Sequence, residues 1–113
     1  MDNLEDVTAR LHAILEPYRD RLEEGHIYGV TVLRRPGAKA HDWFAGVQLV
    51  DGAVKFNLLP MHAHPEILDD ISPNLRQHKR GASVFKFSEL DDGLVAELEA
   101  LVGRAFAVYW PDR

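Results

Sequence analysis

Hydrophobic residues near the start of the chain recur at intervals of three and four positions, the spacing of one helix face. They are Leu4, Val7, Leu11, Ile14, Leu15, Tyr18 and Leu22. Pro17 interrupts the series, and a proline inside a helix removes a hydrogen bond and crowds the preceding turn. We therefore predict a kinked helix or two short helices, ending near Gly25.

The following segments have the composition and pattern of β-strands, because the first is β-branched and apolar and the third alternates apolar with polar residues. We predict strands at His26–Leu33, Asp42–Val50 and Val54–Leu59. The pair Asp51-Gly52 stands between the last two, and such a pair is typical of a two-residue hairpin turn. We therefore expect these two strands to pair antiparallel.

The second half of the chain predicts two short helices, a strand and a long helix. Pro65 and Pro73 stand at positions suited to the first turn of a helix. Ala82–Phe87 predicts the fourth strand, and a final amphipathic helix begins at Ser88 or Asp91. The apolar residues of this last helix share one face: Leu94, Val95, Leu98, Leu101, Val102 and Phe106.

The expected order of elements is α-β-β-β-α-α-β-α, in a single domain of residues 1–113. Hairpin-connected strands with helices at both ends predict an α+β two-layer domain. We expect a mainly antiparallel sheet of about four to five strands, with the helices packed on one face. A chain of 113 residues, of which 46% are hydrophobic, is long enough to bury one core.

Charge and composition narrow the classes of function. The net charge of −5 argues against nucleic acid as a partner, because duplex binding needs clustered cations. The acidic first ten residues do not have the pattern of a signal peptide, and no apolar run reaches the length of a membrane span. We therefore expect a cytoplasmic protein with no membrane partner. The absence of cysteine excludes thiol chemistry and zinc–thiolate sites.

Four segments carry a resemblance to a known family: Val54–Pro60, His64–Leu68, Ile71–Leu75 and Gly81–Phe87. They resemble the YdhG-like domain family of small bacterial proteins of unknown function. Some members are described as frataxin-like iron chaperones, so the resemblance implies iron as a possible cargo. Ala82 stands where the family usually has lysine, and Val84 stands where it often has cysteine. Any chemistry of those family residues is absent here.

Aromatic residues of the expected strands are candidates for a ligand or partner face: Tyr28, Trp43, Phe44 and Phe56. The adjacent Trp43 and Phe44 should point to opposite faces of a strand, so that both faces are apolar at this point. Either a second layer or a partner covers the second face. An open sheet also leaves an edge to protect, which adds a homodimer to the expected partners. The alternative is that these side chains belong to the core.

His62 and His64 are the candidates for metal binding, with Glu66, Asp69 and Asp70 in the following turns. In an extended segment both imidazoles would face the same side, and histidine with carboxylates suits iron, manganese or zinc. We expect no other cofactor. The competing interpretation is that His64 caps a helix and the carboxylates form a solvated helix face.

Two basic groups are candidates for an anionic ligand: Arg34 and Arg35, then Arg76, Lys79 and Arg80. The first group belongs to an expected loop, and the second to the expected end of a short helix before Gly81. The competing interpretation is solubility and complementation of the helix dipole.

Three classes of function follow from these residues. The first is a non-enzymatic binding module that engages a partner protein or a small ligand through the aromatic sheet face. The second is a metal or iron carrier that uses His62, His64 and the nearby carboxylates. An enzyme ranks last, because the sequence has no cysteine nucleophile, no glycine-rich phosphate loop and no recognisable acid–base pair.

Overall fold

A computed structural model describes residues 4–27, 30–39 and 42–111 of the chain. It contains a six-stranded antiparallel sheet in the order β1-β2-β3-β4-β6-β5. The strands are β1 (Glu23–Ile27), β2 (Val30–Arg34), β3 (Ala45–Val50), β4 (Ala53–Leu58), β5 (Lys79–Gly81) and β6 (Val84–Phe87). The predicted α+β class is confirmed, and the sheet has more strands than expected.

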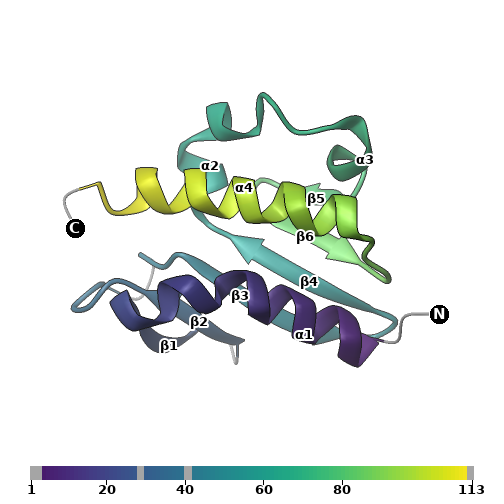
Figure 1. Cartoon of the computed structure of the whole chain (residues 1–113). Helices are drawn as coiled ribbons and strands as arrows, with labels where there is room; N and C mark the ends of the chain where they lie inside the picture. Colours follow the sequence, from purple (N-terminus) through teal and green to yellow (C-terminus); the bar gives the residue numbers. More distant parts are fainter. Residues whose placement is uncertain (1–3, 28–29, 40–41, 112–113) are drawn as a thin grey trace.

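Two long helices cover one face of this sheet. The helices are α1 (Leu4–Leu15), the 3-10 helix η1 (Glu16–Arg21), α2 (Pro60–Ala63), the 3-10 helix η2 (Pro65–Leu68), α3 (Pro73–Arg76) and α4 (Asp92–Tyr109). Helices α1 and α4 contact each other and lie in front of the strands (Figure 1), and the short helices α2, η2 and α3 contact α4. None of the described helices is long and apolar enough to span a membrane.

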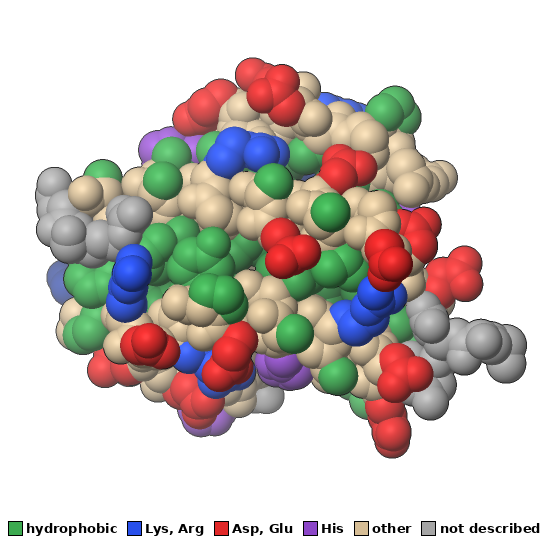
Figure 2. Space-filling model, viewed as in Figure 1, with side chains coloured by type: hydrophobic (Ala, Val, Ile, Leu, Met, Phe, Trp, Pro, Cys, Tyr) green, Lys and Arg blue, Asp and Glu red, His purple; other side chains and the backbone are tan. Residues whose placement is uncertain are grey.

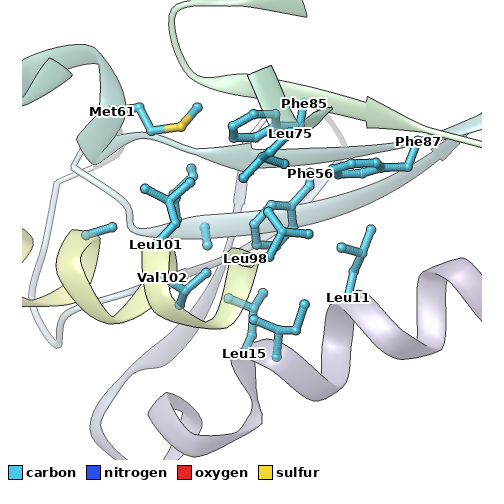
Figure 3. Packing of buried hydrophobic residues seen from close by; sticks show 14 of the residues in the cluster. Leu11, Leu15, Phe56, Met61, Leu75, Phe85, Phe87, Leu98, Leu101 and Val102 are labelled. Carbon is cyan, nitrogen blue, oxygen red and sulfur yellow. The ribbon is translucent and has the colours of Figure 1, made fainter. Parts of the chain in front are cut away.

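The core fills the space between the sheet and the two long helices. Phe56 of β4 has no exposed surface, and the strand register places Phe85 of β6 opposite it. Figure 3 shows Leu11 and Leu15 of α1 and Leu98 of α4 pointing toward the same centre. Burial of each such side chain contributes roughly 1.5–3 kcal/mol to folding. On the surface, hydrophobic side chains gather between the two helices, with charged groups among and around them (Figure 2).

Local signals in the sequence account for several of these boundaries. Helix α1 ends at Leu15, and Pro17 lies in the first turn of η1, as its missing N–H predicts. The Asp51-Gly52 hairpin forms, with Val50 opposite Ala53 and Gly52 at a φ of 77°. Of the two candidates for the last helix, Asp91 is the N-cap, and its carboxylate accepts a hydrogen bond from the Leu94 N–H at 2.8 Å.

Four boundary predictions are wrong. The expected strand His26–Leu33 is two strands, since β1 and β2 pair antiparallel with Ile27 opposite Val30. The first helical region therefore ends earlier, and Gly25 lies within β1. The strand expected from Asp42 begins only at Ala45. The basic run Lys79–Gly81 forms β5 at the edge of the sheet, because the helix before it already ends at Arg76.

Candidate ligand-binding groove

The strands present a second face that α1 and α4 do not cover. Register places Val32 of β2 opposite Gly46 of β3, and Gly46 opposite Asn57 of β4. Because side chains alternate along a strand, these residues point away from the core that Phe56 and Leu58 enter. We call the side of the sheet marked by Val32, Gly46 and Asn57 the open face.

The open face holds a groove with a volume of about 250 Å³. Its lining combines four apolar side chains with two amides: Ile27, Val30, Val32, Trp43, Gln48 and Asn57. None of these side chains is charged. Val32 is only 3% exposed although it does not belong to the helix-side core, so the open face has a small apolar cluster of its own.

Gly46 is a point of close packing in the open face. It lies between Val32 and Asn57 in the sheet register. A Cβ atom at this position would come within 3.0 Å of both the Thr31 carbonyl oxygen and a Val32 methyl group. A side chain therefore does not fit here, because the β2 backbone and Val32 already occupy the space over this glycine.

A network of polar contacts fixes the backbone next to Trp43. The Arg35 guanidinium contacts the Asp42 carboxylate at 2.9 Å and 2.5 Å. The Arg35 N–H donates to the Tyr109 hydroxyl at 3.0 Å, and that hydroxyl donates to the Asp42 carbonyl at 3.2 Å. Burial raises the pKa of Tyr109, which keeps this hydroxyl protonated as a donor. The loop before β3 is thus tied to the end of α4.

Trp43 also borders a second, smaller hollow of about 160 Å³. The opposite walls of this hollow come from α2 and the end of α4, including Pro60, Val108 and Tyr109. One indole therefore takes part in two neighbouring concave surfaces. This makes Trp43 the central side chain of the region.

Two larger hollows of about 490 Å³ each lie elsewhere, and their polar groups serve the fold. One is lined by Asp91, which caps α4, and by His78, whose ring lies 4.9 Å from that of Phe87. The other is lined by Arg35 and Asp42, which bind each other. Volume alone does not mark a ligand site, because such sites need apolar walls with a few convergent polar groups.

The structure corrects the predicted aromatic face. Trp43 lines the groove, but Phe44 and Phe56 have no exposed surface. The Phe44 ring instead packs 5.4 Å from that of Phe106 in the core. The prediction that Phe44 and Phe56 form a ligand face is therefore wrong, because both point toward the helices. Tyr28 lies outside the described residues.

The predicted metal ligands do not converge. Among the residues that the structure describes, no three His, Asp or Glu side chains are placed to hold a metal ion. His62 belongs to α2 and His64 ends it, so they lie on a helical turn, where residues two apart point in different directions. The His64 ring contacts Glu66 at 3.1 Å, while Asp69 and Asp70 are exposed beyond η2.

The predicted basic groups are also used within the fold. Arg34 and Arg35 each pair with a carboxylate, and Arg34 Nε lies 3.3 Å from Glu23 Oε1. The second group stands apart at α3 and β5, where Arg76 and Arg80 donate to main-chain carbonyls and Lys79 begins the edge strand. The five cations therefore form no common site.

The sequence reasoning missed most of the groove: Ile27, Val30, Val32, Gln48 and Asn57. The register of the strands that carry Gln48 and Asn57 could have been predicted from the sequence. A two-residue turn at Asp51-Gly52 sets the register, and counting outward from it places Gln48 opposite Lys55 and Gly46 opposite Asn57.

Comparison with known proteins adds no relative. No protein-family model, no curated protein sequence and no solved structure matches this chain.

Proposed function

We propose that the protein is a non-enzymatic binding module whose site is the groove on the open face. The observation that supports this is Trp43, held at the surface beside aliphatic side chains and two amides. Apolar walls with few polar groups are the usual composition of a small-molecule site. A groove of about 250 Å³ suits a small ligand better than a protein segment.

The chemistry of the lining indicates the shape of that ligand. The Trp43 indole offers a large, rigid and flat surface, which favours a planar apolar partner. Gln48 and Asn57 each carry a donor and an acceptor, so they orient a polar group at the edge of such a ring. They lie on adjacent strands, at diagonal positions of the open face.

The family resemblance belongs to this proposal. The segments that carry the resemblance to the YdhG-like domain family lie in β4, which ends at Leu58, and in α3, which Ser72 caps. The resemblance implies a bacterial protein, and the expectation of a cytoplasmic location rests on the sequence. The metal-carrier alternative finds no support, because its ligands do not converge among the described residues.

The test is a titration with N-phenylnaphthylamine, a neutral aromatic probe whose fluorescence rises in apolar surroundings. We expect the wild-type protein to bind it, and Trp43→Ala to weaken binding by about tenfold or more, a loss of about 1.4 kcal/mol or more. Trp43→Phe should retain part of the affinity because it keeps a flat ring.

Leu49→Ala is the matched control, since Leu49 is 58% exposed on the other face of β3. It should leave the dissociation constant unchanged. Absence of binding by the wild type contradicts the proposal, and so does equal binding by Trp43→Ala with its circular dichroism spectrum intact.

A further inference from the structure

Two lysines lie directly opposite each other on the open face. Register places Lys55 of β4 opposite Lys86 of β6. Both side chains are half-buried, and neither lies within ion-pair distance of a carboxylate in the described part of the chain. Like charges at directly opposite positions destabilise a sheet. The fold thus keeps an unfavourable pair of charges.

The charge of this face is opposite in sign to that of the chain, whose net charge is −5. On the open-face positions of β1 to β4 and β6, the cations are Arg34, Lys55 and Lys86. The only carboxylate at those positions is that of Glu23, and it is already paired with Arg34 at 3.3 Å. The two lysines are therefore the uncompensated charges of the open face.

These lysines stand beside the groove. Gln48 lies opposite Lys55 on β3, and Asn57 lies two residues along β4 on the same face; both line the groove. Directly opposite Cβ atoms in a sheet are about 5 Å apart, and a lysine extends its ammonium on a flexible four-carbon stem. The ammonium groups of Lys55 and Lys86 are thus within reach of the groove rim. The groove lining from β1 and β2 is apolar, whereas β4 and β6 carry the two lysines beside it.

We propose that the groove binds a small amphipathic anion: a flat apolar body with one anionic group at its edge. The body lies against Trp43 and the aliphatic side chains, and the anionic group bridges Lys55 and Lys86. This inference rests on the proposed function of the groove and adds the charge of its ligand. An anion between the two ammonium groups exchanges a repulsion for charge-assisted hydrogen bonds, which are the stronger kind. A neutral ligand leaves the repulsion in place.

The test compares two probes that share one ring system. Anilinonaphthalene sulfonate carries a negative charge, and N-phenylnaphthylamine does not. We expect wild-type protein at low salt to bind the sulfonate about tenfold more tightly. In Lys55→Gln/Lys86→Gln the preference should disappear while the affinity for the neutral probe stays unchanged. Added salt should reduce the preference in the wild type, because screening weakens exposed charge pairs.

Lys39→Gln is the matched control, because it removes one lysine from the loop between β2 and β3 and should leave both affinities unchanged. Equal affinity of the two probes in the wild type overturns the anion proposal, and so does an unchanged sulfonate affinity in the double variant. Loss of both probes by a folded double variant overturns it as well. In each of these cases the proposed function of the groove is retained if Trp43→Ala still weakens binding of the neutral probe. It is contradicted if Trp43→Ala binds that probe as tightly as the wild type does.

Discussion

The two faces of the sheet differ in burial and in residue type although the same strands form both. On β4, Val54, Phe56 and Leu58 enter the core and have no exposed surface. Lys55 and Asn57, between them in the sequence, lie on the open face and are half-buried. Burial decides the residue types of the covered face, where apolar side chains from sheet and helices interlock (Figure 3).

The open face carries features that stability does not explain. It holds a half-buried tryptophan, Trp43, and a pair of opposed lysines, Lys55 and Lys86. The opposed lysines are unfavourable for folding, and the indole leaves part of its apolar surface exposed, so a ligand is a reason for both. Residues that disagree with the fold are where function is best sought.

The largest difference in stability between the two faces is expected at adjacent residues of β4. Phe56→Ala should lower the free energy of unfolding by about 3–5 kcal/mol, because it removes a fully buried ring and leaves a cavity. Asn57→Ala should change it by less than about 1 kcal/mol, since its side chain lies on the open face. Urea unfolding monitored by circular dichroism measures both. Similar losses in the two variants would contradict the division into faces.

A smaller loss of stability is expected at Gly46, where the strands pack too closely for a side chain. Gly46→Ala should cost about 1–3 kcal/mol, because its Cβ would lie 3.0 Å from the Thr31 carbonyl oxygen and from a Val32 methyl group. Gly103→Ala in α4 is the control, since its Cβ would meet only the Tyr18 hydroxyl at 3.5 Å. That change should stabilise the helix by roughly 0.5–1 kcal/mol. Equal responses in thermal melts would show that the approach at Gly46 is not tight.

Removing one of the opposed lysines should stabilise the ligand-free protein. Lys86→Gln relieves the repulsion with Lys55, and we expect a gain of about 0.2–1 kcal/mol at low salt. The gain should shrink in high salt, while Lys39→Gln should change stability little in either condition. A loss of stability in Lys86→Gln would mean that the two charges do not oppose each other.

Local patterns made the covered face predictable. The alternation around Phe56, the break at Pro17 and the apolar stripe of the last helix each depend on neighbours in the sequence. Pairings between distant strands were not predictable. Lys55 and Lys86 become neighbours only because β6 pairs with β4 across three short helices. The spacing of residues in the sequence does not predict that contact.

The same limit explains the errors at single residues. Which of Trp43 and Phe44 enters the core depends on the register of the sheet, and either choice fits the sequence. The basic run Lys79–Gly81 suits a helix end as well as a short charged edge strand, and pairing with β6 selects the strand. The metal prediction assumed an extended His62–His64 segment, and α2 makes it a helical turn.

The smallest expected effect lies on the covered side, at the ionisable residue His12 of α1. Its Nδ1 atom is buried with no hydrogen-bond partner in the described part of the chain. Burial lowers the pKa of His12, and nearby Arg19 lowers it further, against the opposing influence of Glu16 and Glu24. The unfolded chain therefore binds this proton more readily, so stability is lost as pH falls below the ordinary histidine range near 6.5. His12→Gln should flatten the dependence of the urea midpoint on pH between about pH 7 and pH 5. An equally steep dependence in both proteins would show that His12 protonates as easily in the folded chain as in the unfolded chain.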